Sequence, residues 1–322
     1  MAWIIENNDS FTLKLSPSLA FNNLTSSVSS VAYVHRGDVI LCGLDGDVKC
    51  TLKNDAGAYA LQVLLCSGED FDFLVIALNT GIQVWSSDGA RLIYFFAATP
   101  KTDLTGDVSS HHTQGIALVP KGRIFVVGCS DGDIFAFEAK RGSNGENVEL
   151  MATLRGHDHP IICAGADGEY CVTGDAGGTI LAWKVENNLA RDRCFRGEGV
   201  PVTAVCVREG SVVAAFSTGH LRIFDTRSES LVVEIAAHSR IINAIDLHPT
   251  TMLVATVGED FLLNVWELPD LNDKTQSGQV GLVASSRVAN RLLTGVRFLV
   301  DGSQRIAGTS YDCSTLHLWH KL

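Results

Sequence analysis

The amino-acid sequence predicts an all-β fold, a seven-bladed propeller, on three observations. A short phrase, in which a turn leads into an alternating strand that ends in Trp or Phe, recurs along the 322-residue chain. The steps between successive copies lie around the roughly 40 to 45 residues that a four-stranded propeller blade requires. No window of roughly 11 to 18 residues keeps a helical period, which excludes strands that alternate with helices in a parallel sheet.

The phrase is clearest at "GEDFLLNVWEL", Gly258 to Leu268, where alternating apolar residues lead up to a tryptophan. The steps between successive copies are 34, 52, 46, 41, 42 and 53 residues. A weaker first copy, "DGDVKCTLK", has a threonine at the aromatic place. The residues that mark the seven predicted blade centres are Thr51, Trp85, Phe137, Trp183, Phe224, Trp266 and Trp319. We therefore expect one propeller domain over residues 1–322.

Further strands precede most of these positions. A second strand, such as "EYCVTG" or "MLVATV", lies ahead of the phrase, and a third, such as "PIICAG" or "INAIDL", lies ahead of that. The chain stops three residues after Trp319, so the last blade is expected to lack its outer strand. In "SFTLKLS", Ser10 to Ser16, Phe11, Leu13 and Leu15 alternate with polar residues. Residues 1–16 are therefore expected to supply the strand that closes the ring and removes exposed sheet edges.

The first blade is expected to be incomplete. Only "NDAGA" separates Lys53 from Tyr59, which is too short for a further strand. The blade should then have three strands, lack its outer strand, and leave Asp47 to Lys53 as an open edge. Either the charges of Lys49 and Lys53 prevent another strand from pairing with this edge, or the edge accepts a strand from a partner or from a second copy of the chain.

Composition narrows the possible partners and compartment. The chain carries 25 Lys plus Arg against 36 Asp plus Glu, a net charge of −11, with the basic residues scattered. This balance argues against nucleic acid or an anionic membrane as the main partner, since both require a positive surface. The N-terminus has no basic segment and no long apolar run follows, so we expect a cytoplasmic protein without membrane insertion. Nine cysteines without a C-x-x-C pair are expected to be reduced thiols.

These repeats resemble those of the WD-repeat β-propellers. Five stretches are more particular than the general pattern and resemble one member of the family, in order from about Leu74 to Asp312: "GIQVWSSDG", "GEGVPVTAV", "AAHSRIINAIDL", "GEDFLLNVWEL" and "GTSYD". The resemblance implies a structural hydrogen-bond chain in blade six, formed by His238, Thr256, Asp260 and Trp266. The residue types suit that role, because a buried indole N–H needs a partner, Thr both accepts and donates, and His connects it to a carboxylate.

By the same resemblance, other blades keep only part of this chain. Blade four has His157, Thr173 and Trp183, but Gly177 stands in the acid's place. Blade three has an acid but ends in Phe137, which needs no hydrogen-bond partner. We therefore expect most blades to be held by apolar burial, at about 1.5 to 3 kcal/mol for each buried aromatic residue.

Two motifs suggest chemistry that their context does not support. Ser130 lies in a G-x-S-x-G sequence, but an alternating strand follows where a hydrolase needs a helix, so a hairpin turn is expected. Histidines occur in close pairs, yet no Cys or carboxylate completes a four-ligand set at the usual spacing; the pairs are His111 with His112, His157 with His159, and His317 with His320. The sequence has no P-loop or dinucleotide motif. We expect no metal, no cofactor and no enzymatic activity.

The leading functional hypothesis is a non-enzymatic scaffold or adaptor whose propeller loops bind one or more partner proteins, with a homo-oligomer possible. The alternatives are an architectural subunit of a cytoskeletal or ciliary assembly, and an enzyme that uses the central channel as a small-molecule pocket. The enzyme would need titratable residues in the channel, whereas inner strands such as "IALV" and "IICAG" are apolar and small. Candidate partner-binding residues around the expected channel mouth are Ser130, His159, Arg196, Arg240, Glu259, Phe261 and Asp312.

Overall fold

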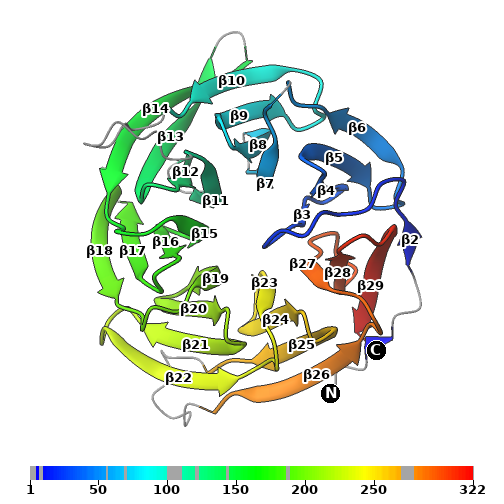
Figure 1. Ribbon diagram of the computed structural model, residues 1–322, viewed down its shortest axis with the longest axis vertical. Coiled ribbons are helices and arrows are strands. Elements are labelled where there is room, and N and C mark those ends of the chain that lie inside the picture. Colours follow the sequence, from blue (N-terminus) through cyan, green and yellow to red (C-terminus); the bar gives the residue numbers. More distant parts are fainter. Residues whose placement is uncertain are drawn as a thin grey trace.

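The computed structural model describes residues 5–6, 10–55, 57–68, 71–99, 111–119, 123–142, 145–185, 189–269 and 279–321. Within these ranges every regular element is a β-strand, and the strands form seven antiparallel sheets arranged in a ring (Figure 1). The prediction of an all-β, seven-bladed propeller is confirmed. In this part of the chain no helix is long and apolar enough to cross a membrane.

Each sheet runs outward from the centre of the ring in chain order. Blade one has β3 (Thr25–Ser26), β4 (Ser30–His35), β5 (Asp38–Gly43) and β6 (Val48–Leu52), and blade two has β7 (Ala60–Ser67), β8 (Asp72–Leu78), β9 (Gly81–Ser86) and β10 (Leu92–Ala97). Blade three has β11 (Thr113–Val119), β12 (Ile124–Cys129), β13 (Asp133–Gly142) and β14 (Gly145–Arg155), and blade four has β15 (Ile161–Asp167), β16 (Tyr170–Asp175), β17 (Ile180–Val185) and β18 (Leu189–Phe195).

The remaining blades follow the same order. Blade five has β19 (Val202–Arg208), β20 (Ser211–Phe216), β21 (His220–Asp225) and β22 (Ser230–Ala236), and blade six has β23 (Ile242–Leu247), β24 (Leu253–Gly258), β25 (Leu262–Glu267) and β26 (Gly281–Arg287). Blade seven has β27 (Leu293–Phe298), β28 (Arg305–Ser310) and β29 (Thr315–Lys321), with the N-terminal β1 (Ile5–Glu6) and β2 (Phe11–Thr12) at its outer side.

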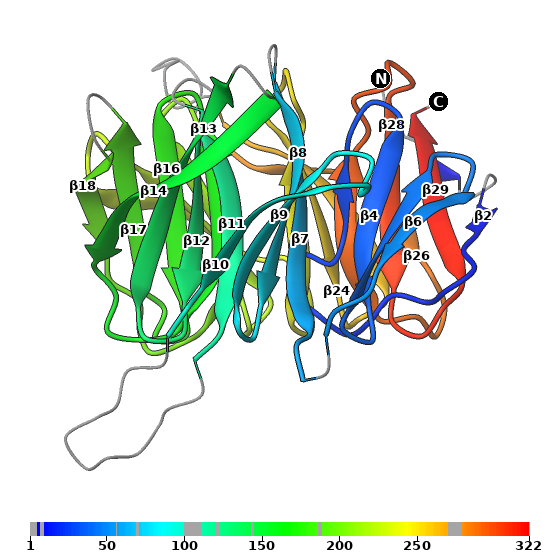
Figure 2. The ribbon, with the colours of Figure 1, turned by 90° about the horizontal axis from the view of Figure 1, so that it is seen from above.

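The hydrophobic core lies between the facing sheets of neighbouring blades, which stand side by side around the ring (Figure 2). Alternating side chains of each strand point to opposite faces, so every blade contributes apolar residues to two such layers. Between blades two and three, the rings of Phe125 and Phe137 stack at 4.9 Å, and Phe73 packs beside Phe125 at 5.6 Å. These layers hold each blade at a fixed angle to the next.

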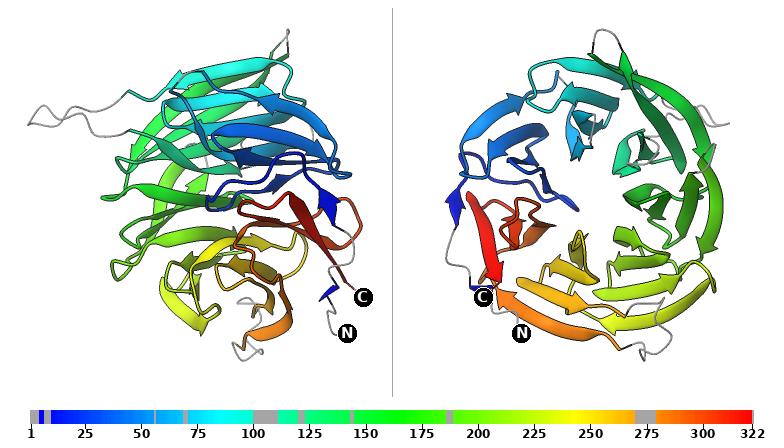
Figure 3. Two further views of the ribbon diagram at one scale, coloured as in Figure 1. Left: turned by 45° about the vertical axis from the view of Figure 1, so that its right-hand side comes forward. Right: turned by 180° about the vertical axis from the view of Figure 1, so that it is seen from behind.

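The N-terminal segment closes the ring, as predicted. β1 and β2 both pair with β29, with Ile5 opposite Lys321 and Phe11 opposite Leu316. The dark-blue strands lie against the red β29 in both views of Figure 3. Leu13 is 1% exposed and belongs to the apolar cluster that joins blades seven and one. Residues 1–4 and 7–9 of the expected closing segment lie outside the described ranges.

Blade one differs from the prediction in its strand count. It has four strands, because the two-residue β3 forms its innermost strand, and the expectation that the outer strand is missing is wrong. Thr51 lies on the fourth strand, whereas every other blade-centre residue lies on a third strand. The polar stretch "NNLTSSVSS" around β3 has no apolar alternation, so sequence patterning could not reveal it. β6 is the outermost strand of its sheet, as expected for an edge.

Candidate functional site

One face of the ring collects the loops that the sequence pointed to. We call it the start face, because the innermost strand of each blade begins there. In an antiparallel blade the second strand ends and the third begins at this same face. All seven candidate partner-binding residues lie in segments at this face: Ser130, His159, Arg196, Arg240, Glu259, Phe261 and Asp312. Their shared placement follows from strand direction alone.

The seven residues differ in exposure and in local constraint. His159, Arg196, Arg240 and Asp312 are exposed, whereas the other three are partly buried. Phe261 and Asp312 adopt left-handed backbone angles, with φ of 69° and 47°. Asp312 also donates its backbone N–H to the carbonyl of Pro17 at 3.2 Å, which ties its turn to the N-terminal segment.

A hollow of about 350 Å³ opens on the start face beside the channel. Its lining is mostly apolar, and Glu259 supplies its one charged group: the lining residues are Leu19, Ala20, Phe21, Leu61, Gln114, Ile162, Asn243 and Glu259. Leu19 is 54% exposed. Of the seven predicted residues, the structure brings only Glu259 to this hollow. The others in its lining were missed because they lie before or at the start of inner strands, where nothing in the sequence marks them.

The hollow is floored by the N-terminal segment Leu19–Asn22, which reaches across the channel. Asn22, with φ of 53°, donates its backbone N–H to Asn243 O at 3.0 Å in blade six. Its side-chain amide donates to Thr203 O at 3.1 Å in blade five. In Figure 1 the segment before β3 extends from blade one towards the centre of the ring. The segment therefore separates the start-face hollow from the rest of the channel.

A second cavity, of about 310 Å³, occupies the channel beyond this segment. The expectation of an apolar inner wall is wrong here, because Asp167, Arg208, Asp246 and Arg297 all line it. The charges are paired: Asp246 contacts Arg297 at 2.7 Å, and Asp167 lies 3.6 Å from Arg208. Asp246 also accepts the Phe298 backbone N–H at 2.7 Å. These contacts tie blade six to blade seven and blade four to blade five, which is a structural task.

Blade six contains a continuous hydrogen-bond chain between its buried polar side chains. His238 Nδ1 lies 2.8 Å from Asp260 Oδ1, and His238 Nε2 lies 2.8 Å from Thr256 Oγ1. Trp266 donates its indole N–H to the same hydroxyl at 3.0 Å. Burial raises the pKa of the Asp260 carboxyl, but hydrogen bonds from His238 and from backbone N–H groups outweigh it, so that this pKa lies below its usual value.

Blade four has the same chain, with its acid at a different position. His157 lies 2.8 Å from Asp175 Oδ2 and 2.7 Å from Thr173 Oγ1, and Trp183 donates to that hydroxyl at 3.0 Å. The expectation that blade four lacks an acid, because Gly177 stands at its position, is wrong: the carboxylate comes from Asp175 at the end of β16, two residues earlier. Asp175 is fully buried and also accepts the backbone N–H groups of Gly177 and Thr179. Asp175 is the only acidic residue in the turn after Thr173, and this was the signal in the sequence that could have identified it.

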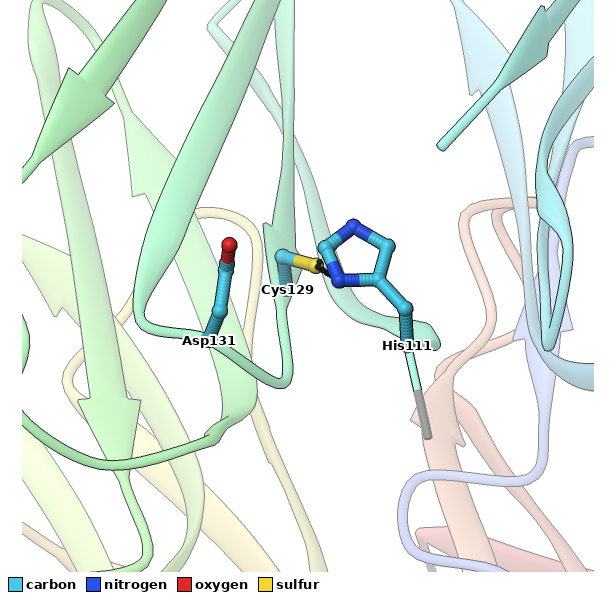
Figure 4. A group of neighbouring side chains, drawn as sticks. All are labelled: His111, Cys129 and Asp131. Carbon is cyan, nitrogen blue, oxygen red and sulfur yellow. Dashed lines mark hydrogen bonds between the residues drawn. The ribbon is translucent and has the colours of Figure 1, made fainter. Parts of the chain in front are cut away.

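Blade three brings together a histidine, a cysteine and an aspartate that the sequence analysis left apart. The thiol of Cys129 lies 3.2 Å from His111 Nε2, and Asp131 stands on the other side of the sulfur (Figure 4). One ligand atom from each residue lies within 4.8 Å of the other two. Burial raises the pKa of the Cys129 thiol to about 12, the opposite of what a nucleophilic cysteine needs. Ser130 lies in the turn between β12 and β13, so the hydrolase motif is a hairpin.

Comparison with known proteins gives a consistent result. The model of the WDR54 family matches residues 53–321 of this chain. WD repeat domain 54 of Rattus norvegicus is 29% identical over 251 residues, which are 76% of this chain and 73% of that protein. WD repeat-containing protein 54 of Homo sapiens is 28% identical over 253 residues, with the same shares covered. The resemblance of this chain to WD repeat-containing protein 54 is confirmed.

More distant relatives share the fold. WD repeat-containing protein 55 of Mus musculus is 28% identical over 191 residues, which cover 56% of this chain and 48% of that protein. A chain in the crystal structure of the mitotic checkpoint complex superposes with a TM-score of 0.77 at 14% identity, over 99% of this chain and 92% of that one. At that identity the likeness shows the propeller architecture alone.

Proposed function

Because the chain belongs to the WDR54 family of WD-repeat proteins, we propose that it is a non-enzymatic scaffold or adaptor that binds a partner protein on its start face. WD-repeat propellers generally mediate interactions between proteins. The proposal adds a place and a chemistry: a partner segment inserts an apolar side chain into the start-face hollow and pairs a basic group with Glu259.

The observation that carries the proposal is the lining of that hollow. It combines an apolar floor with one carboxylate and has a volume of about 350 Å³, enough for one or two side chains. Leu19, in the segment that floors the hollow, leaves 54% of its surface exposed. Anchors of this kind, an apolar side chain in a pocket beside a satisfied charge, supply most of the energy of small interfaces.

The titratable groups support a non-enzymatic role. Asp175 and Asp260 are each engaged by a histidine and by backbone N–H groups, and Asp246 is engaged by Arg297 and a backbone N–H. Groups whose hydrogen bonds are met inside the protein have little capacity left for a substrate. We place the protein in the cytoplasm, in keeping with its nine free cysteines, and expect proteins, not nucleic acid, as partners.

The test compares three surface variants in affinity purification from native cells with quantitative mass spectrometry. Leu19→Asp and Glu259→Lys should each lose the same partner proteins by an order of magnitude or more. Val300→Asp is the matched control, because Val300 is 48% exposed and lines the opposite end of the channel. Equal partner recovery with all four proteins would refute the placement on the start face. Recovery of a bound metabolite without any protein partner would favour the enzyme alternative.

A further inference from the structure

We propose that blade three holds a binding site for a divalent cation of the zinc class, formed by His111, Cys129 and Asp131. The site lies on the start face, where the segment before β11 meets the turn between β12 and β13. It is independent of the proposed partner hollow, since none of its three residues lines that hollow.

The positions of the three ligand atoms carry the first part of the argument. Nitrogen and sulfur ligands of one tetrahedral zinc ion, at about 2.0 to 2.1 Å and 2.3 Å, stand about 3.5 Å apart. His111 Nε2 and Cys129 Sγ are 3.2 Å apart, close to that separation. The Asp131 oxygen lies within 4.8 Å of both, and Asp131 Oδ1 accepts the Asp133 backbone N–H at 3.1 Å, which holds the carboxylate in the turn beside the other two ligands. Cys129 also approaches His112 O at 3.3 Å.

A comparison of blades carries the second part. Each hydrogen-bonded blade offers its histidine one acidic partner and has glycine at the alternative position: blade four has Asp175 with Gly177, and blade six has Asp260 with Gly258. A Cβ at Gly258 would stand 3.0 Å from His238 Nδ1. Blade three fills both positions, with Cys129 in the place of Asp175 and Asp131 in the place of Asp260. Within the part of the chain that the structure describes, this is the blade in which a histidine has two further ligand groups beside it.

The rest of the hydrogen-bond chain is missing from blade three. The hydroxyl that holds the histidine elsewhere is replaced by Val127, which pairs with Phe135 as Thr173 pairs with Leu181. The indole is replaced by Phe137. In blades four and six both ring nitrogens are engaged, by Asp and Thr. In blade three the ring of His111 instead faces a sulfur, so its nitrogen is available to a metal.

The ligand types select the ion. A thiolate, an imidazole and a carboxylate suit zinc and its neighbours far better than Mg²⁺ or Ca²⁺, which prefer oxygen alone. Binding exchanges the Cys129 S–H bond for a sulfur–metal bond and releases the proton to water, without any change of oxidation state. Three protein ligands leave the fourth position of the tetrahedron for a water molecule. The bound ion would link the segment before β11 to the turn between β12 and β13.

Cobalt(II) is the probe, because a thiolate ligand gives it a near-ultraviolet charge-transfer band. The full chain, stripped with chelator, is titrated with Co²⁺ and then with Zn²⁺. We expect one cobalt per chain with this band, displaced by zinc, and a higher unfolding temperature on zinc addition. Cys194→Ser is the matched control, since Cys194 is the exposed cysteine and lies outside the site. It should behave as the wild type does.

Cys129→Ser should abolish the charge-transfer band, and His111→Gln should weaken cobalt binding at least tenfold. If Cys129→Ser or His111→Gln fails to fold, Asp131→Asn still tests the site, because Asp131 lies in a partly exposed turn. The absence of a band in the folded wild type would overturn the proposal. So would a band that survives in Cys129→Ser, or equal cobalt affinity in the wild type and Asp131→Asn.

Discussion

Removal of the Asp260 carboxylate tests whether the blade-six chain stabilises the fold. Asp260 accepts His238 at 2.8 Å and the Ser239 backbone N–H at 3.0 Å, and its side chain is 7% exposed. Asp260→Ala leaves the buried His238 donor without a partner, which costs about 1 to 3 kcal/mol. With an unfolding entropy of about 2.1 cal/mol/K per residue over 322 residues, that loss lowers the melting temperature by about 1.5 to 4.5 °C.

The assay is thermal unfolding at pH 7, followed by circular dichroism, with Asp158→Ala as the control. Asp158 is an exposed acid on the same face, so the control matches the change in net charge. The pKa of Asp260 lies below its usual value, so its stabilisation is present above the unfolded pKa of about 3.9 and is lost as pH falls through the folded value. The two variants should therefore converge in acid. Equal melting temperatures at pH 7 would refute the structural role, and loss of partner binding by a stable Asp260→Ala would make Asp260 a site residue.

Three further predictions concern other parts of the ring. Deletion of residues 1–16 should lower the unfolding free energy by at least the roughly 1.5 to 3 kcal/mol that burial of Leu13 contributes; an unchanged melting curve would contradict closure by this segment. Burial lowers the pKa of His317 from about 6.5 to about 4. As the pH falls from 6.5 to 4, the unfolded state therefore binds the extra proton, and the free energy of unfolding should fall by up to about 1.4 kcal/mol per pH unit. In urea titrations, the unfolding free energy of His317→Gln should depend less on pH than that of the wild type. Equal pH dependence in the two proteins would exclude this role of His317. If this edge recruits a strand, hydrogen exchange should slow only when a partner is bound at those amides of Val48–Leu52 that do not donate to β5; protection of these amides already present in the dilute monomer would rule that out.

The sequence by itself determined the architecture. Alternation of apolar residues sets which face of a strand is buried, and the return of a tryptophan or phenylalanine marks six of the seven blades, with the weaker copy at Thr51 marking the first. Both are properties of neighbouring residues, so they can be read along the chain. The closing strand followed in the same way from the alternation of Phe11 with Leu13, and the placement of Ser130 in a hairpin followed from the strand after it. The residues of the blade-six chain could be named only through the family resemblance.

Tertiary structure alone decided the details of the site. Blade four takes its acid from Asp175, not from the position six residues before the tryptophan, because Asp175 pairs with Ile161 at the end of β16 and its carboxylate there meets His157. The two-residue β3 is a strand only because β4 pairs with it. Leu19–Asn22 crosses the channel through bonds to carbonyls about 180 to 220 residues away in sequence. Such contacts join residues that no local pattern links, and only the closed ring brings them together.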